Sequence, residues 1–144
     1  MSKSIEETIE GKWHETLQQI RLRLRRGMDG ETSTNQRKMG LDYEVNFGVN
    51  LLRLQELAKS LPKEEELADL MWHKKVREMK LLSLMIRSVD TLTMDQALTL
   101  ADEVETLEVA EQLVFRLFRR APFAAELLSA LFERKYDRHT PSAT

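Results

Sequence analysis

Apolar residues recur every three or four positions along most of this chain, the spacing that places them on one face of an α-helix. The longest run covers residues 4–28 and contains Ile9, Trp13, Leu17 and Ile20 at that spacing. The pattern predicts six further helices, over residues 51–61, 64–73, 74–89, 94–104, 107–120 and 123–136. No stretch alternates apolar and polar residues as a half-buried strand does. The sequence therefore predicts an all-α protein.

Residues that start and stop helices agree with these segments. Asn50 and Thr93 each precede one of them, and short polar side chains of this kind accept a hydrogen bond from a free amide of the first helical turn. Pro62 ends the helix over 51–61 because proline cannot donate the next backbone hydrogen bond. Polar residues 33–36 are expected to cap a further short helix that ends at Met39.

A faint internal repeat links two of the predicted helix pairs. When residues 67–86 are shifted by 31 positions, their apolar residues fall on apolar residues of 98–117, and Lys80 falls on Glu111. Helix pairs stacked in series form α-solenoids such as HEAT repeats. We therefore expect stacked antiparallel helix pairs in a HEAT-like α-α superhelix, in which Lys80 and Glu111 pair between neighbouring helices.

The composition is that of a helix-rich globular protein. The chain has 144 residues, 42% hydrophobic and 32% charged, which suits one domain over residues 1–136 and a flexible tail over residues 137–144. It has no cysteine, so disulfides, thiol catalysis and cysteine-bound metals are excluded. The amino terminus has no apolar signal region, and no apolar run is long enough to span a membrane. We therefore expect a cytoplasmic protein with no membrane contact.

Motifs for metals and cofactors are absent from the sequence. The three histidines, His14, His73 and His139, are scattered, and no glycine-rich phosphate loop occurs. We therefore expect no metal and no cofactor. Trp13 and Trp72 lie on apolar helical faces, where core packing is favoured over a platform for a stacked nucleic-acid base.

Basic residues are clustered, although the formal net charge is -2. That net charge is not typical of a nucleic-acid-binding protein, which is usually clearly basic. The four arginines between residues 20 and 26 alternate with leucines, which favours a solvated helix surface over a phosphate clamp. Two further clusters lie at residues 74–80 and 116–120.

A carboxylate interrupts the apolar face of the predicted helix over 107–120. Leu107, Ala110 and Val114 share that face with Glu111. Burying an unpaired carboxylate in an apolar environment is costly. Glu111 therefore lies either at the edge of the core with its carboxylate in water, which is the favoured interpretation, or in a functional cleft.

Three motifs, the second of which is a pair of segments, resemble those of a known family in order and in spacing. FGVNLLRLQELAK at 47–59 is similar to the motif YGV-x-x-x-x-LR-x-LAK. LADLMW at 67–72 and VREMKLL at 76–82 are similar to LA-x-x-LW and hEAR-x-LA, and ETLEVAEQ at 105–112 is similar to D-S-W-D-h-x-D. Together they resemble the DNA alkylation repair enzymes, alkylpurine DNA glycosylases of HEAT-like fold.

The resemblance implies a curved stack of helix pairs with a basic concave surface for duplex DNA. Members of the family hydrolyse the glycosidic bond of N-alkylated purines, and an aspartate stabilises the cationic sugar of the transition state. That aspartate aligns with Glu111, which is one methylene longer, and the family's first tryptophan aligns with Leu107, which offers no aromatic face. Glu111 is thus the candidate catalytic residue, with Leu107 and Glu108 in the cleft. The residues expected to contact DNA are Lys74, Lys75, Arg77, Lys80, Arg116, Arg119 and Arg120.

Three functions stay open at this point. We favour a scaffold related to these enzymes that binds DNA and has a weakened or lost glycosylase site. The alternative is a helical-repeat module that binds proteins, including a second copy of itself through its terminal helices. The third is an active glycosylase that uses Glu111.

Overall fold

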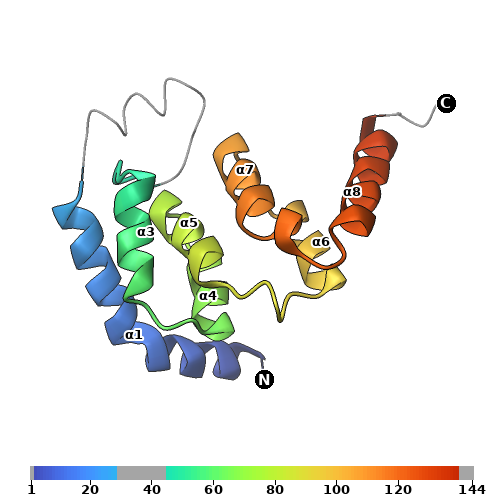
Figure 1. The fold of residues 1–144 in the computed structure, drawn as a ribbon. Coiled ribbons are helices and arrows are strands. Elements are labelled where there is room, and N and C mark those ends of the chain that lie inside the picture. The colour runs from blue at the N-terminus through green and yellow to red at the C-terminus, as the bar shows by residue number, and fades with distance from the viewer. Residues whose placement is uncertain (1, 29–44, 140–144) are drawn as a thin grey trace. The chain divides into compact units, whose positions relative to one another are not determined.

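A computed structural model describes residues 2–28 and 45–139 of the chain, with side chains for 8–28 and 45–134 (Figure 1). The helices are α1 (Ser2–Arg26), α3 (Leu51–Lys59), α4 (Glu65–Trp72), α5 (Arg77–Ile86), α6 (Met94–Asp102), α7 (Leu107–Arg116), the 3-10 helix η1 (Phe118–Arg120) and α8 (Ala124–His139). The described residues contain no strand. An isolated parallel bridge joins Val45 and Val76. The all-α prediction is confirmed, whereas the HEAT-like superhelix stays a prediction. The short helix expected before Met39 lies outside the described residues.

The chain forms two compact units, Met1–Arg87 and Ser88–Thr144. The expected single domain over residues 1–136 stays a prediction. The expected tail over residues 137–144 also stays a prediction, and α8 is described as far as His139. Residues 140–144 lie outside the described residues.

Unit 1 is built around the pair α4 and α5, against which α3 and α1 pack. Leu54 of α3, Leu67 of α4 and Leu82 of α5 are fully buried. Helix α1 contributes Leu17 and Ile20, three residues apart on its buried face. Apolar residues at this spacing drive the helices together because burial removes their surface from water.

Both expected helix caps are confirmed. The Asn50 Oδ1 atom accepts a hydrogen bond from the Arg53 amide at 2.9 Å, at the start of α3. Thr93 and Gln96 form a reciprocal capping box at the start of α6. These caps satisfy amides that would otherwise have no partner in the first turn.

Unit 2 contains α6, α7, η1 and α8. Val109, Leu113 and Leu117 are buried at intervals of four residues along α7 and its end. Shifted by 31 positions, α5 covers residues 108–117, so it begins and ends one residue later than α7. The buried faces of α4 and α6 do not correspond, because α6 buries Ala97 and Leu100. The repeat therefore describes helix positions better than it describes packing.

Candidate functional site

Glu111 lies on the exposed side of α7. The buried residues of that helix are Val109 and Leu113, whereas Leu107 is 69% exposed and Val114 is also exposed. The apolar face inferred from the sequence was therefore wrong, because the core packs against a face rotated away from it. The favoured interpretation of Glu111, a carboxylate in water, is confirmed.

The other expected residues of the cleft do not enclose Glu111. Leu107 projects from the first turn of α7, and Glu108 is half-buried beside it. An exposed carboxylate stabilises a developing cation weakly, because water screens the charge. Among the residues with described side chains, no group of three His, Asp or Glu is placed to hold a metal ion.

The most highly organised polar group of unit 1 is an ion pair between Arg77 and Glu78. These side chains are 2% and 0% exposed, and their atoms Nη1 and Oε2 lie 2.8 Å apart. Glu78 also accepts hydrogen bonds from the backbone amides of Phe47 and Val49, both at 3.1 Å. Arg77 Nη1 donates to the Val49 carbonyl at 2.8 Å. Arg77, which the sequence placed among the DNA contacts, instead lies in the core, where it holds the segment before α3.

This arrangement brings together two of the motifs that carried the family resemblance. Gly48 has a φ of 72°, a backbone conformation that favours glycine, and it allows the amides on either side to face Glu78. The Val45 carbonyl accepts a hydrogen bond from the Arg77 amide at 2.9 Å. Arg77 and Glu78 are adjacent charged residues within the apolar segment 74–89. This pattern in the sequence could have indicated the buried ion pair.

The remaining lysines of the 74–80 cluster differ in their surroundings. Lys74 forms an ion pair with Glu10 of α1. Lys80 Nζ donates to the Trp72 carbonyl at 2.9 Å and lies 5.4 Å from the centroid of the Trp72 ring. Lys75 is exposed. Lys75 is therefore the most accessible of the four residues expected to contact DNA here.

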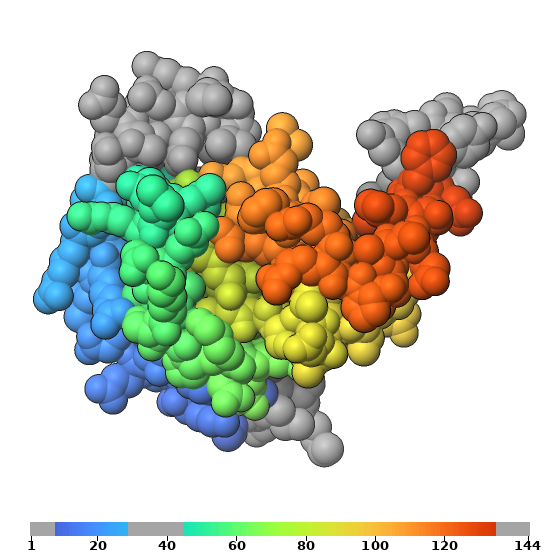
Figure 2. Space-filling view, viewed as in Figure 1, coloured from blue at the N-terminus to red at the C-terminus, as the bar shows by residue number. Residues whose placement is uncertain are grey.

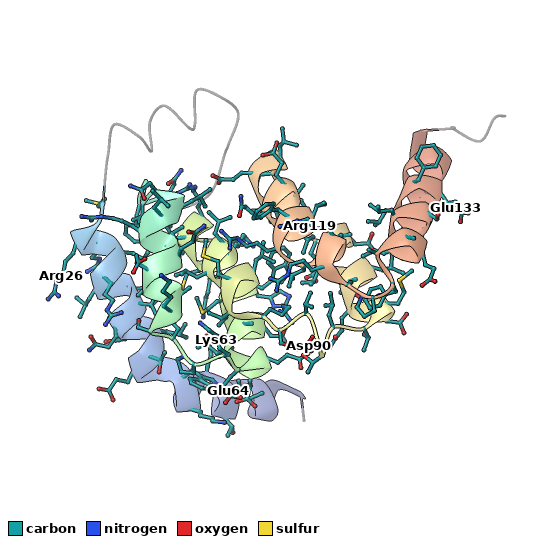
Figure 3. The ribbon with its side chains drawn as sticks, in the orientation of Figure 1. Arg26, Lys63, Glu64, Asp90, Arg119 and Glu133 are labelled. Atoms are coloured by element: carbon teal, nitrogen blue, oxygen red, sulfur yellow. The ribbon has the colours of Figure 1, made fainter. Side chains whose placement is uncertain are left out.

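The second expected cluster, in unit 2, combines arginines with an exposed aromatic ring. The Arg119 guanidinium lies 4.3 Å from the centroid of the Phe115 ring, and Arg120 is exposed. Arg116 is half-buried, its Nε donates to Gln112 Oε1 at 2.8 Å, and burial lowers its pKa. Figure 3 labels Arg119 on this part of unit 2.

A third basic surface lies at the carboxyl-terminal end of α1, where the sequence favoured a solvated helix surface over a phosphate clamp. Arg21, Arg23, Arg25 and Arg26 are all exposed, and Arg53 of α3 is exposed as well. We call these five residues the α1 arginine surface. Within the part of the chain whose side chains are described, no carboxylate lies within ion-pair distance of Arg25, Arg26 or Arg53. Figure 2 shows α1 (blue) beside α3 (green), and Figure 3 shows Arg26 projecting away from the helices.

The amino-terminal half of α1 is tied to α4 by polar contacts. Trp13 Nε1 donates to Glu66 Oε1 at 3.0 Å, and Lys12 Nζ lies 3.1 Å from the same oxygen. These hydrogen bonds lower the pKa of Glu66, and the hydrogen bond from Lys74 lowers that of Glu10. Trp13 is half-buried, whereas Trp72 is buried in the core as the sequence favoured.

Acid should weaken the contact between α1 and α4. Because the folded pKa of Glu66 lies below its ordinary value of 4.5, its stabilising contribution is present above that pH and is lost as the pH falls through the folded pKa. We expect the Trp13 indole N–H resonance to titrate as the pH falls below 4.5, while that of Trp72 stays unchanged. The Glu66→Gln variant is the control and should abolish the titration. A Trp13 resonance that does not move would contradict this prediction.

No helix among the described residues is long and apolar enough to cross a membrane. No protein-family model, curated protein or solved structure matches this chain. The resemblance to DNA alkylation repair enzymes therefore rests on the three sequence motifs.

Proposed function

We propose that this chain binds the phosphate backbone of duplex DNA, as a divergent relative of the DNA alkylation repair enzymes with a weakened or lost glycosylase site. The observation that carries the proposal is the α1 arginine surface, whose exposed guanidinium groups are available to phosphate oxygens. The cytoplasmic location expected from the sequence is part of the same proposal.

Exposed arginines without carboxylate partners suit phosphate binding for two reasons. Among the described side chains, no ion pair has to be broken before Arg25, Arg26 or Arg53 contacts a phosphate. Each contact also releases counterions from the DNA, which favours binding at low salt. A local cluster of this kind is compatible with a net charge of -2, because charge screening restricts each interaction to about 10 Å at 0.1 M salt.

Catalysis is the weaker part of the family resemblance. Glycosidic bond hydrolysis requires a carboxylate placed against the sugar in a site with little water. Glu111 is exposed, and Leu107 next to it is exposed too. We therefore propose binding to DNA as the retained property and expect no release of alkylated purines.

Removing charge from the α1 arginine surface should weaken DNA binding. We expect the triple variant Arg21→Gln, Arg25→Gln, Arg26→Gln to lower the slope of log K against log salt by about 2 to 3, since each phosphate contact contributes about 0.9. The measurement is fluorescence anisotropy of a labelled duplex, with and without a 7-methylguanine, over a salt series.

The matched control is the triple variant Lys75→Gln, Arg119→Gln, Arg120→Gln. It removes the same charge from residues that the sequence predicted to contact DNA. A smaller effect of this control supports the α1 arginine surface. A larger effect would move the DNA-binding surface to these residues. Absence of salt-dependent binding in the unmodified protein would overturn the proposal altogether.

A second candidate function, self-association, is favoured by the outer surface of α8. Leu128 and Phe132 are exposed one helical turn apart, Phe132 by 71% of its surface. Glu126 and Glu133 are also exposed on α8, and Figure 3 shows Glu133 pointing away from the helix. An exposed aromatic ring surrounded by arginines, at Phe115, offers a complementary surface on a second copy.

Substitution of Phe132 by serine tests self-association. We expect light scattering to show that the unmodified protein forms a dimer or larger assembly, and that Phe132→Ser shifts it to the monomer. The control Ser129→Ala changes the same exposed side of α8 without removing an apolar anchor. A monomer at every concentration would exclude this function.

A further inference from the structure

The carboxyl-terminal end of α1 and the helix α3 line a cavity of about 440 Å³ in unit 1 that is open to solvent. Arg23 and Arg53 line it from the two helices, and the apolar side chains of Leu24 and Leu57 lie beside them. Two guanidinium groups therefore share one concave site. Like charges in one place are unfavourable unless an anion lies between them.

Arg23 is held in this position by Ser60. The Ser60 hydroxyl donates to the Leu57 carbonyl at 2.8 Å, and the same oxygen accepts a hydrogen bond from Arg23 Nη1 at 2.6 Å. The hydrogen of the hydroxyl is therefore used within α3, and Ser60 acts as an acceptor that orients the guanidinium. The other donors of Arg23 stay available, since a guanidinium has five N–H groups.

Arg53 lies close to the backbone of Gly27. A Cβ atom at Gly27 would lie 3.2 Å from Arg53 Nη1 and 3.5 Å from a methyl group of Val49. The guanidinium therefore packs closely against the backbone at the end of α1. Among the described side chains, none forms a hydrogen bond or an ion pair with that of Arg53.

The acid that lines the cavity is already paired. Glu56 Oε1 lies 3.0 Å from Lys59 Nζ, on the exposed side of α3. The cavity thus presents two arginines and one carboxylate whose charge Lys59 offsets. Arginine is suited to oxyanions with several oxygens because its planar N–H groups bind two of them at once.

We propose that this cavity is a phosphate-binding site in which Arg23 and Arg53 hold one phosphate group. The inference rests on the proposed function when the phosphate is that of a DNA backbone. A free phosphate group has the same chemistry and is the other source that the experiment must distinguish.

The test uses the whole chain, with inorganic phosphate and a labelled duplex as separate probes. Amide resonances around residues 23–27 and 49–60 should shift saturably with phosphate at constant ionic strength. Arg53→Gln should weaken phosphate binding by about tenfold, since a charge-assisted hydrogen bond contributes about 1.5 kcal/mol or more. Arg134→Gln removes the same charge from unit 2, where Arg134 pairs with Asp102, and should leave phosphate binding unchanged.

The Gly27→Ala variant separates the site from general charge effects. It keeps every charge, and its added methyl group lies 3.2 Å from Arg53 Nη1, so the guanidinium must shift slightly. We expect several-fold weaker phosphate binding with an unchanged or higher unfolding midpoint, because Gly27 does not have a positive φ and alanine loses less backbone entropy than glycine on folding.

The outcomes distinguish this inference from the proposed function. Phosphate shifts that both cavity variants weaken, together with weaker binding of the duplex, would support a backbone phosphate as the occupant. Phosphate shifts without any duplex binding would support the cavity for a free phosphate group and overturn the proposed function. Duplex binding without saturable phosphate shifts, or shifts that neither variant changes, would overturn the cavity site.

Discussion

The Glu78→Gln variant should lose about 3–5 kcal/mol of the free energy of unfolding, because it removes the buried carboxylate whose Oε2 atom lies 2.8 Å from the Arg77 guanidinium. Arg77 is 2% exposed and cannot recover hydration in the folded state. In glutamine, one of the two carboxylate oxygens becomes an NH2 group. That group cannot accept the hydrogen bond that the Phe47 or the Val49 backbone amide donates to Glu78. A loss of this size approaches the whole stability of a small domain.

Tryptophan fluorescence during urea unfolding is the appropriate measurement for this variant. Trp13 and Trp72 are the two tryptophans of the chain, and both belong to unit 1. The fluorescence therefore reports on the unit that contains Glu78, independently of unit 2.

Glu56→Gln is the matched control for Glu78→Gln. Its ion pair with Lys59 is exposed on both sides, and exposed pairs contribute about 0–1 kcal/mol. A loss below about 1 kcal/mol for Glu78→Gln as well would show that the buried pair does not hold the segment before α3.

The Leu54→Ala variant should lower the free energy of unfolding by about 2–5 kcal/mol. Leu54 is 0% exposed and lies on the side of α3 that packs against α5. Removal of its side chain leaves a cavity that the rigid neighbouring helices fill only partly. The same fluorescence measurement detects the change, since α3 is part of unit 1.

Leu52→Ala, two positions away on the same helix, is the control. Leu52 is 74% exposed, so its truncation should change the free energy of unfolding by less than about 0.5 kcal/mol. If both leucine variants lost equal stability, the buried side of α3 would have been assigned incorrectly.

These two buried residues also bear on the proposed DNA surface. The segment held by Glu78 leads directly to Asn50 and α3, and α3 supplies Arg53 to both the α1 arginine surface and the phosphate cavity. A variant that weakens this packing should therefore lower DNA affinity indirectly. Binding experiments with Glu78→Gln need a prior measurement of folding to separate the two effects.

The sequence by itself determined the helices and their caps. Helix formation depends on neighbours three and four residues away, so the segments around α3, α4, α6 and α8 could be predicted from local patterns. Asn50 and Thr93 act within one helical turn, and for that reason both caps were predicted correctly.

The faces that these helices bury were decided by tertiary structure. The apolar positions of α7 allow more than one buried face, and packing within unit 2 selects Val109 and Leu113 rather than Leu107. The role of Arg77 depends on Val49, which is distant in sequence. The cavity beside Gly27 likewise requires α1 and α3 to pack together. A linear pattern carries the local preferences of each helix, whereas burial depends on contacts between segments that only the folded chain brings together.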